Sequence, residues 1–383
     1  MANIKDSEFD RYLSLYDLPE IKHEERVSEE FFQHCKENIR FVVLAICNRN
    51  GETLYLRYFN KNVGWELPGG FIDQNESLVD AINRIVKDEA GTEIDEVQPI
   101  AYLENSFSCG DETVKHQGIG FVAITDEEEA SNTDNIKRCF SHNIPDNMAY
   151  QDEEVVRAAK PQIEEKIGNL PTDEIDSSRE FYLSHLVHKH LINRLFGQRA
   201  SRKQKKALVN EIDTAPNSIL DAACGDDNTI FKLEKEFNPQ LCLANDISWK
   251  TISVVRNKFD EEDIIFTNHN VLNLPYKKKF DLILFKNSLH HIDNSKQKEL
   301  ISQLSKQCKV LIVIDIKDPR NGNLKSRIWN WYYRKILGDQ GEDFLDYDGF
   351  KRIISSATSD RETNFNLVNT VKGEYMMAKV EEK

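Results

Sequence analysis

The stretch ILDAACGDDN, residues 219–228, decides how the second half of this chain folds, because an apolar run ends there in a sharp polar turn. Such a change predicts a strand that passes directly into a helix. Gly225 lets the backbone approach a ligand closely, and the N-terminus of the following helix offers unpaired N–H groups. A lone glycine turn is a weak signal, so its meaning depends on the neighbouring segments.

Apolar strands alternate with amphipathic helices around this turn. Five runs predict strands: SILDAAC (218–224), LCLAND (241–246), IIFTNHN (264–270), FDLILFKNS (280–288) and KVLIVIDI (309–316). NFNLVNTV (364–371) and EYMMAKV (374–380) predict a final β-hairpin around Lys372 and Gly373. The alternation predicts a parallel, doubly wound α/β sheet that binds its ligand at the carboxyl ends of the strands.

Polar side chains stand at the ends of four of these strands. Asp221 ends the first strand and Asp246 the second, where a carboxylate can accept hydrogen bonds from both hydroxyls of a ribose. Asn270 ends the third, where an amide can meet the edge of an adenine, and Lys286 lies at the polar end of the fourth. Most such residues are ordinary loop residues or helix caps. Four polar ends in this order favour a nucleoside-binding site over that alternative.

Residues 179–383 therefore resemble a class I methyltransferase that uses S-adenosylmethionine. By similarity, Asp221 and Gly225 belong to the methionine end of the cofactor, Asp246 to its ribose and Asn270 to its adenine. A nicotinamide-binding dehydrogenase is the nearest competitor, but the turn lacks G-x-G-x-x-G. The resemblance implies a Rossmann-like, doubly wound, seven-stranded sheet, and it implies a cofactor site made of Asp221, Ala223, Gly225, Asp246, Ile247, Asn270, Val271 and Lys286.

The turn departs from the family pattern D-x-G-x-G-x-G at two positions. Ala223 replaces the first glycine, which is a mild change, and Asp227 replaces the third, which adds a negative charge beside the binding loop. Asn270 stands where an aspartate is commoner, and it can still accept a hydrogen bond from an exocyclic amine. These departures bear on the affinity for the cofactor more than on the class of enzyme.

Two features downstream bear on methyl transfer itself. His290 and His291 follow the fourth strand, where the family approaches the transferred methyl group, so either can serve as a general base, although such a histidine is more often structural. The long segment after the fifth strand carries Trp329, Trp331 and Tyr332. In similar enzymes this insertion covers the acceptor, which makes these aromatic side chains candidate substrate residues. A helix that packs its aromatic residues into the core explains them almost as well.

The first half of the chain contains a second motif, GGFIDQNESLVDAINRIVKDEAGTEI, residues 69–94. The motif and the preceding GWELPGG resemble the Nudix family over residues 38–168, which implies an α/β/α sandwich with a mixed sheet. Asp88 is a conservative change, Thr92 replaces the last apolar residue, and Ile85 stands where the signature has a glutamate. Six positions match the signature G-x5-E-x7-R-E-U-x-E-E-x-G-U, where U is a bulky apolar residue: Gly70, Glu76, Arg84, Val86, Glu89 and Gly91.

Residues 85, 88 and 89 share one face of a helix, where carboxylates can hold divalent cations against a pyrophosphate. The resemblance implies Mg²⁺ or Mn²⁺ on Asp88 and Glu89, a catalytic role for Glu89, and substrate contacts from Gly70 and Arg84. Ile85 leaves two carboxylates, so hydrolysis should fall steeply if the missing group is essential. Three other glutamates lie in segments that can border the same cleft: Glu104, Glu112 and Glu153.

Three interpretations of this motif stay open. The domain hydrolyses a nucleoside diphosphate linked to another moiety, or it only binds or senses such a ligand. The plainest alternative is an amphipathic helix with Leu78, Ile82 and Ile85 as its apolar stripe, which explains Ile85 but not the glycines, Glu76 and Arg84.

The length of 383 residues predicts two domains. We place a Nudix domain at 38–168 and a methyltransferase domain at 179–383, with a helical extension at 1–37 and a linker at 169–178. The first domain has an acidic loop at 125–135 and ends in a helix at 152–168. Its predicted strands are IRFVVLAIC (39–47), ETLYLRYF (52–59), AYLENSFSC (101–109) and GIGFVAIT (118–125).

Acidic residues outnumber basic ones 65 to 50, and a formal charge of -15 repels nucleic-acid backbones and anionic membranes. The expected partners are therefore a small-molecule methyl acceptor and a nucleoside diphosphate derivative, with RNA or cap-like processing as a weaker alternative.

No signal peptide or apolar run of about 18 residues is present, which predicts a cytoplasmic protein. The seven cysteines contain no C-x-x-C pair and predict reduced thiols. The histidines of HLVHKH (185–190) do not share one helix face, which disfavours a metal site.

Overall fold

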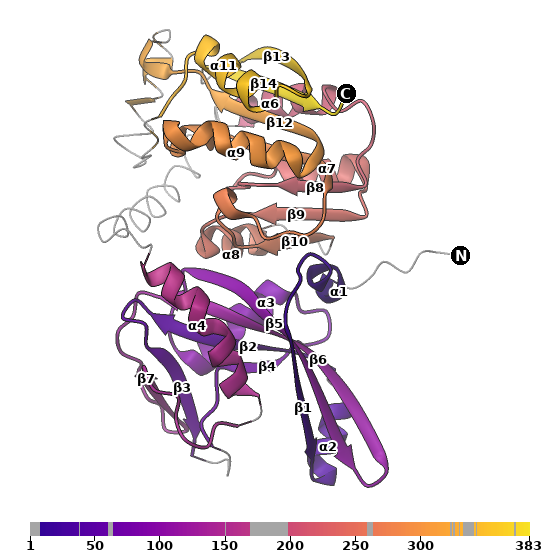
Figure 1. Cartoon of the computed structure of the whole chain (residues 1–383), viewed down its shortest axis with the longest axis vertical. Helices are drawn as coiled ribbons and strands as arrows, with labels where there is room; N and C mark the ends of the chain where they lie inside the picture. Colours follow the sequence, from indigo (N-terminus) through magenta and orange to yellow (C-terminus); the bar gives the residue numbers. More distant parts are fainter. Residues whose placement is uncertain are drawn as a thin grey trace. The chain divides into compact units, whose positions relative to one another are not determined.

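The structure is a computed structural model that describes residues 8–37, 39–59, 64–149, 151–168, 198–258, 263–321, 324, 326–328, 330–331, 341, 343–370 and 373–383. These residues form two compact units, each with its own sheet (Figure 1). The expected linker at 169–178 and the histidines of 185–190 lie outside the described residues. Within the described part of the chain, no helix is long and apolar enough to cross a membrane.

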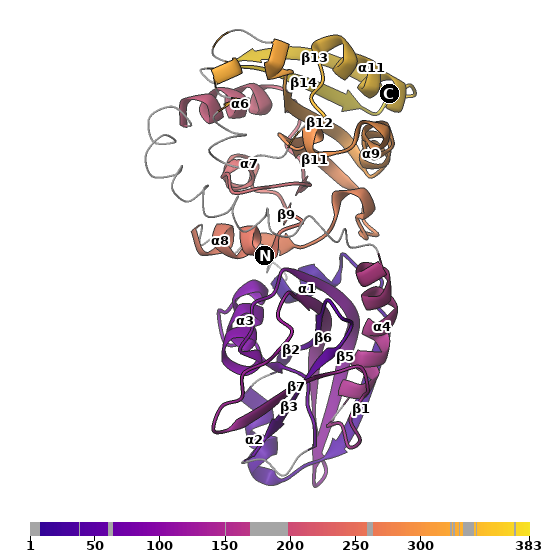
Figure 2. The ribbon, with the colours of Figure 1, turned by 90° about the vertical axis from the view of Figure 1, so that its left-hand side faces the viewer.

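The N-terminal unit is built on a seven-stranded mixed sheet with the order β1-β5-β6-β2-β3-β7, and β4 also pairs with β2. The pairs β1–β5 and β2–β6 are parallel, whereas β5–β6, β2–β3, β2–β4 and β3–β7 are antiparallel. Figure 2 shows α3 and α4 on opposite sides of this sheet, which confirms the α/β/α sandwich. The elements are α1 (Glu8–Leu13), β1 (Glu20–Arg26), α2 (Glu29–Glu37), β2 (Arg40–Asn48), β3 (Thr53–Tyr58), β4 (Gly69–Phe71), α3 (Leu78–Ile85), η1 (Val86–Ala90), β5 (Glu96–Cys109), β6 (Glu112–Thr125), β7 (Ile136–Ser141) and α4 (Asp152–Gly168).

Residues 8–37, the described part of the helical extension predicted at 1–37, are not helical throughout. Helices α1 and α2 do form there, but β1 lies between them and pairs in parallel with residues Tyr102 to Ser108 of β5. The segment EIKHEER has no apolar alternation, so its own pattern does not predict a strand. Backbone hydrogen bonds to the long strand β5 stabilise it instead. The edge strand β7 is likewise absent from the sequence prediction.

The central strand β2 is buried along almost its whole length, as its run of apolar residues predicts. One face of the sheet packs against α4, where Val155, Ala159 and Ile163 join a cluster with Val43 and Ala45 of β2. Helix α4 spans the predicted residues and continues through Pro161, which lacks the N–H for one helix hydrogen bond.

The helix of the Nudix-like motif changes its winding halfway. Ser77 caps α3, and its Oγ accepts the Asp80 N–H at 3.1 Å. After Ile85 the chain winds as the π-helix η1, which ends at Gly91 with a left-handed φ of 64°. Because a π-helix has more residues per turn than an α-helix, residues 85, 88 and 89 do not repeat with the α-helical spacing that the sequence argument assumes.

The C-terminal unit is built on a second seven-stranded sheet with the order β10-β9-β8-β11-β12-β14-β13. The registered pairs β8–β9, β8–β11 and β11–β12 are parallel, and β14 pairs antiparallel with β12 and β13, so the predicted final hairpin is confirmed. Figure 2 shows α6 and α7 on one side of the sheet and α9 and α11 on the other, as in a doubly wound fold. The elements are α6 (Gln198–Asn210), β8 (Ser218–Asp221), α7 (Thr229–Phe237), β9 (Leu241–Asn245), α8 (Trp249–Lys258), β10 (Ile264–Thr267), η3 (Val271–Asn273), β11 (Phe280–Lys286), η4 (Leu289–His291), α9 (Asn294–Lys306), β12 (Cys308–Ile316), η5 (Pro319–Asn321), α11 (Tyr347–Ala357), β13 (Glu362–Asn369) and β14 (Glu374–Glu381).

Strand β8 lies between β9 and β11, which makes it the point at which the strand order reverses. Asp221 at its end aligns with Ala244 of β9 and Leu284 of β11, so the three carboxyl ends share one edge. In open α/β sheets, ligands bind in the crevice at such a switch point. The fold therefore places the predicted polar residues where a ligand site is expected.

Candidate functional site

The turn after β8 is held in place by both neighbouring strands. The Ala222 N–H donates to the Leu284 carbonyl at 2.9 Å, and the Cys224 N–H donates to the Asn245 carbonyl at 2.9 Å. Gly225 has a left-handed φ of 55°, and a Cβ added there would meet nothing within 4 Å. The structure thus leaves open space where the sequence predicts that a ligand approaches the backbone.

Asp246 lies directly across from this turn. Its Oδ2 accepts the Gly225 N–H at 2.9 Å, so the carboxylate that the sequence places at a ribose is fixed beside the glycine. A carboxylate has about four acceptor positions, so this hydrogen bond positions Asp246 without exhausting its capacity. The next residue, Ile247, exposes 60% of its surface, and Ala223 is half-buried in the turn. An exposed isoleucine beside a polar edge suits a ligand with an apolar face.

Asp221 is the most unusual side chain at this edge. It is fully buried, and neither of its carboxylate oxygens has a hydrogen-bond partner among the described residues. Burial raises the pKa of its carboxyl group, Lys286 lowers this pKa, and the charge of Asp246 raises it. A buried polar group without a partner destabilises a fold, so such groups are kept mainly where function needs them. Asp221 is therefore the strongest candidate for a ligand-binding side chain at this edge, and its contact with a cofactor stays a prediction.

Lys286 ends β11 and belongs to an ionic cluster at the same edge. Its ammonium group forms an ion pair with Asp227, the residue at the third glycine position, and donates to Thr229 Oγ1 at 2.8 Å. Burial lowers the pKa of Lys286, and Asp221 raises it. The extra charge of Asp227 is thus compensated within the chain.

Asn270 and Val271 follow β10 at the start of η3. Asn270 is exposed, and its side-chain oxygen caps η3 by accepting the Leu272 N–H at 3.0 Å. The oxygen has a second acceptor position and the amide has two donors, so a contact with adenine is chemically compatible with this cap. The adenine contact of Asn270 and Val271 stays a prediction.

His290 is held by a carboxylate that the sequence did not single out. Its Nδ1 lies 2.7 Å from Oδ1 of Asp315, and its backbone N–H donates to Asp315 Oδ2 at 2.9 Å. Both side chains are buried, and Phe344 stacks on the imidazole with ring centroids 4.8 Å apart. A carboxylate on Nδ1 fixes the ring orientation and leaves Nε2 as the nitrogen that can take up a proton.

The structure distinguishes the remaining candidates for methyl transfer. His291 is exposed, and Trp331 exposes 59% of its surface, whereas Trp329 and Tyr332 lie outside the described residues. Asp315 could have been found from the sequence, because it too lies near the carboxyl end of a predicted parallel strand. Phe344 does not lie at the end of a predicted strand, so the sequence gives no indication that its ring stacks on His290.

In the N-terminal unit, Arg84 and Glu76 of the Nudix-like motif form a bidentate ion pair. Nε and Nη2 of Arg84 each donate to an oxygen of Glu76 at 2.7 Å, and Nη2 also donates to the Phe71 carbonyl at 2.8 Å. These bonds tie α3 to the loop before it, which explains the spacing of both residues in the motif. Gly70 faces Ile85, since a Cβ at Gly70 would lie 3.7 Å from Ile85 Cδ1. Substrate contacts of Gly70 and Arg84 stay predictions.

Ile85 and the two acidic residues predicted to hold a metal ion differ in their exposure. Ile85 is 1% exposed, while Asp88 is exposed and Glu89 is half-buried. Oε2 of Glu89 accepts the Gly69 N–H at 2.9 Å, and the Tyr58 hydroxyl also hydrogen-bonds to Glu89. Among the side chains that the structure describes, no group of three or more His, Cys, Asp or Glu could hold a metal ion. Glu89 therefore helps to hold the Gly69 loop, and its carboxylate has further acceptor positions, so a metal ion on Asp88 and Glu89 stays a prediction.

The three glutamates that could have replaced the missing ligand each pair with a cation: Glu104 with Lys115, Glu112 with Lys36 and Glu153 with Arg157. Burial raises the pKa of Asp152 to about 8, although the Leu67 N–H, which donates to Oδ2 at 2.7 Å, lowers it. In this region the negative charges of Glu66, Glu154 and Glu89 also act on the carboxyl group of Asp152 and raise its pKa. Glu66 and Asp152 lie outside the signature, so its pattern gives no signal for them.

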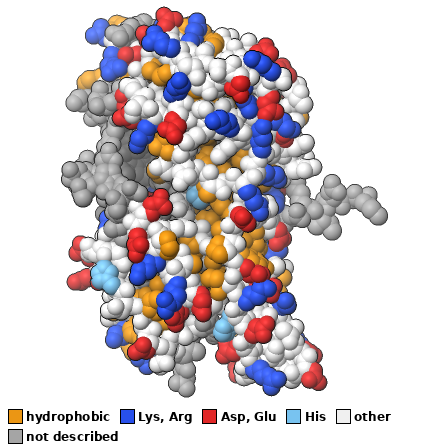
Figure 3. Space-filling model, viewed as in Figure 1, with side chains coloured by type: hydrophobic (Ala, Val, Ile, Leu, Met, Phe, Trp, Pro, Cys, Tyr) orange, Lys and Arg blue, Asp and Glu red, His pale blue; other side chains and the backbone are white. Residues whose placement is uncertain are grey.

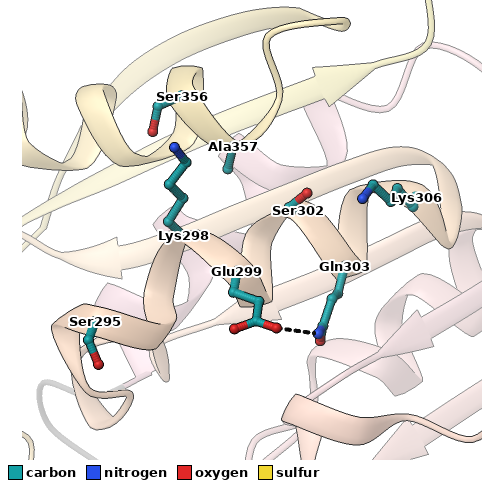
Figure 4. A pocket seen from close by; sticks show the side chains of 8 residues that line it. All are labelled: Ser295, Lys298, Glu299, Ser302, Gln303, Lys306, Ser356 and Ala357. Carbon is teal, nitrogen blue, oxygen red and sulfur yellow. Dashed lines mark hydrogen bonds between the residues drawn. The ribbon is translucent and has the colours of Figure 1, made fainter.

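A surface hollow of about 470 Å³ lies between α9 and α11 (Figure 4). Figure 4 shows Lys298 of α9 reaching toward Ser356 of α11. None of the predicted site residues lines this hollow, which places it apart from the polar edge of the sheet. It is lined by Ser295, Lys298, Glu299, Ser302, Gln303, Lys306, Ser356 and Ala357.

Comparisons with known proteins agree with both halves of this description. The model of a methyltransferase domain matches residues 219–310, and the model of a NUDIX domain matches residues 36–160. The RNA pyrophosphohydrolase of Shewanella piezotolerans (strain WP3 / JCM 13877) is 35% identical over 60 residues, which are 16% of this chain and 34% of that protein. The chain thus spans about a third of the length of this curated relative.

Three solved methyltransferases resemble part of the chain at low identity. The magnesium protoporphyrin IX methyltransferase of Synechocystis PCC 6803 is 15% identical, with 61% of this chain and 100% of that chain covered and a TM-score of 0.38. The plantazolicin methyltransferase BpumL is 14% identical, with coverage of 55% and 92% and a TM-score of 0.41. The methyltransferase domain of bacterial CtHen1 is 12% identical, with coverage of 48% and 99% and a TM-score of 0.39. The chain combines a NUDIX domain at residues 36–160 with a methyltransferase domain at residues 219–310.

Proposed function

We propose that the C-terminal domain binds S-adenosylmethionine at the carboxyl edge of its sheet and methylates a small-molecule acceptor. The observation that carries this proposal is Asp221, a fully buried carboxylate without a hydrogen-bond partner among the described residues, beside a turn in which Asp246 holds Gly225. The ammonium group and the ribose hydroxyls of the cofactor are donors that suit these acceptors. When bound, the cofactor supplies a methyl group on a positively charged sulfur. A nucleophile on the acceptor would take this methyl group, and S-adenosylhomocysteine would leave.

The residues of this edge divide the binding of the cofactor among them. Asp221 and the Gly225 turn, with Ala223, receive the methionine end. Asp246 receives the ribose hydroxyls, and Ile247 covers the neighbouring apolar face of the cofactor. Asn270 and Val271 meet the adenine. This division follows the order in which β8, β9 and β10 end along the sheet.

His290 serves as the general base for an acceptor that must lose a proton. Its ring is fixed by Asp315 and Phe344, so Nε2 keeps one orientation without a search among rotamers. His291 is exposed, which makes it the weaker candidate. Trp331, with Trp329 and Tyr332 from the same segment, is proposed to contact the acceptor, because an exposed indole offers a flat apolar surface.

Calorimetric titration with S-adenosylhomocysteine tests the cofactor site. The wild type should bind, and Asp246→Ala should weaken binding by about tenfold or more, since it removes acceptors for the ribose and the hold on Gly225. Asp360→Ala is the matched control, because Asp360 is exposed in the turn before β13. A wild type that binds neither S-adenosylmethionine nor its product would end this proposal.

For the N-terminal domain, we propose binding of a nucleoside diphosphate derivative without metal-dependent hydrolysis. The position of Glu89 favours this over turnover, because its carboxylate holds the Gly69 N–H and Ile85 fills the place of a third carboxylate. The test is cleavage of the pyrophosphate bond with Mg²⁺ present, followed as formation of nucleoside monophosphate from nucleotide sugars and dinucleotides and as release of pyrophosphate from 5′-triphosphorylated RNA. We expect none above background. Cleavage that Glu89→Gln abolishes would establish the hydrolase alternative instead.

A further inference from the structure

Asp227 occupies the turn position at which the methyltransferase pattern has its third glycine. Within the described turn, Gly225 alone has a positive φ, so the backbone at position 227 does not require glycine. A glycine at this position would add no side chain and no charge, whereas Asp227 adds a carboxylate to the turn. Its side chain is 32% exposed, so water screens its charge only in part.

Two buried lysines from different elements converge on Asp227. Lys286 of β11 forms an ion pair with it and donates to Thr229 Oγ1 at 2.8 Å. Lys205 of α6 donates to Asn228 Oδ1, and its Nζ lies 3.9 Å from the Asp227 carboxylate. The lysine side chains are 4% and 8% exposed, respectively. Buried ammonium groups are tolerated where a carboxylate compensates them, so these contacts are mutually dependent.

The same lysines act on the carboxylate that marks the ligand site. Burial raises the pKa of Asp221, whereas the charges of Lys286 and Lys205 lower it. Lys286 is therefore shared between its ion pair with Asp227 and the field at Asp221. Removing Lys286 would release the turn and strip Asp221 of its strongest nearby positive charge.

We propose that Lys286 is a positioning residue of the cofactor site: by pairing with Asp227 it holds the glycine-rich turn in the shape that receives S-adenosylmethionine. This inference rests on the proposed function of the C-terminal domain. Lys286 acts through the turn and touches no reacting atom. Asp227 thus departs from the family pattern together with a charge partner, because the carboxylate that stands in place of the third glycine forms an ion pair with Lys286.

A double-mutant cycle on the full chain tests this coupling. The dissociation constant for S-adenosylhomocysteine is measured by calorimetry for the wild type, Lys286→Met, Asp227→Gly and the double variant. Lys286→Met should weaken binding by about 10- to 100-fold, because it removes one of the two buried lysines that compensate the charge of Asp227. The double variant, which restores glycine, should recover the part of this loss that comes from the weakened pairing of Asp227. Lys309→Met is the matched control, since Lys309 pairs with Asp281 at 2.7 Å and is 65% exposed.

The outcomes separate a positioning role from a structural one. Variants that lose thermal stability but keep the wild-type affinity, or single effects that merely add in the double variant, would overturn the proposal. If Lys286→Met does not fold, Asp227→Asn weakens the same pair from its more exposed side and should still raise the dissociation constant several-fold; an unchanged constant would count against the pairing. A wild type that binds no S-adenosylhomocysteine would defeat the proposed function itself, which distinguishes the two failures.

Discussion

Asp152 couples the stability of the N-terminal domain to pH. Its carboxyl group is buried, which raises its pKa to about 8, so the folded state holds a proton that the unfolded chain releases near pH 4. The contribution of Asp152 to the free energy of unfolding is complete below the pKa of an unfolded aspartate, and it is lost as the pH rises toward 8. Asp152→Asn, which can still accept the Leu67 N–H, should abolish this loss.

Between pH 6 and pH 8, the free energy of unfolding of Asp152→Asn should rise relative to that of the wild type. The difference should grow by at most about 1.4 kcal/mol per pH unit. Scanning calorimetry at pH 6, 7 and 8 measures it as a widening gap between the two midpoints. Asp146→Asn, at an exposed carboxylate of the same domain, serves as control. Parallel pH profiles for Asp152→Asn and the wild type would show that Asp152 is ionised throughout.

Asp315 is the residue through which the role of His290 can be tested. Asp315→Asn replaces the acceptor of Nδ1 and should lower the initial rate of methyl transfer by about 10²- to 10⁴-fold, as loss of a general base or its orienting carboxylate does. The rate is followed with labelled S-adenosylmethionine and the metabolite fraction that the wild type labels. Affinity for S-adenosylhomocysteine should stay within about threefold. Equal rates for wild type, Asp315→Asn and His290→Gln would reduce the pair to a structural contact.

Among the elements, the C-terminal strands are the best predicted from sequence, because each is a short apolar run bounded by polar residues. Their carboxyl ends then follow from parallel pairing, which is why Asp221, Asp246 and Lys286 could be placed at one edge. Strand β1 escapes prediction, since EIKHEER is stabilised by its partner β5 and not by its own pattern. Phe344 and Asp152 escape it as well, because contacts across long sequence separations decide their surroundings.

The winding of the Nudix-like helix bears on the metal site, which stays a prediction. Ile85, the last residue of α3, is buried directly before the π-helix η1, and the Glu89 carboxylate accepts the Gly69 N–H. Ile85→Glu, which restores the signature, should therefore destabilise the domain by roughly 3 kcal/mol or more, because it buries a carboxylate. Ile85→Val, the control, should cost only about 0.5–1.5 kcal/mol. Urea unfolding measures both. A stable Ile85→Glu variant that gains Mg²⁺-dependent cleavage of the pyrophosphate bond in nucleotide sugars or dinucleotides would refute the assignment of Glu89 to a loop contact alone.

For the whole molecule, the net charge favours small metabolites over RNA as the predicted partners. The formal net charge is -15, and Figure 3 shows Asp and Glu interspersed with Lys and Arg over one face. Affinity for nucleic acid depends on cations that displace counterions from phosphates, so a binding surface needs clustered Lys and Arg.

We therefore expect no binding of a 5′-triphosphorylated RNA at micromolar protein, and no methylation of it. Fluorescence anisotropy at 50 and 200 mM salt checks the binding, because phosphate contacts weaken steeply over this range. Binding at low salt that vanishes at 200 mM would reveal a local basic patch that overrides the net charge. Salt-resistant binding together with transfer of labelled methyl to the RNA would reverse the choice of acceptor. The negative charge would then have to be offset by base stacking, for which the exposed Trp331 would be the first residue to replace.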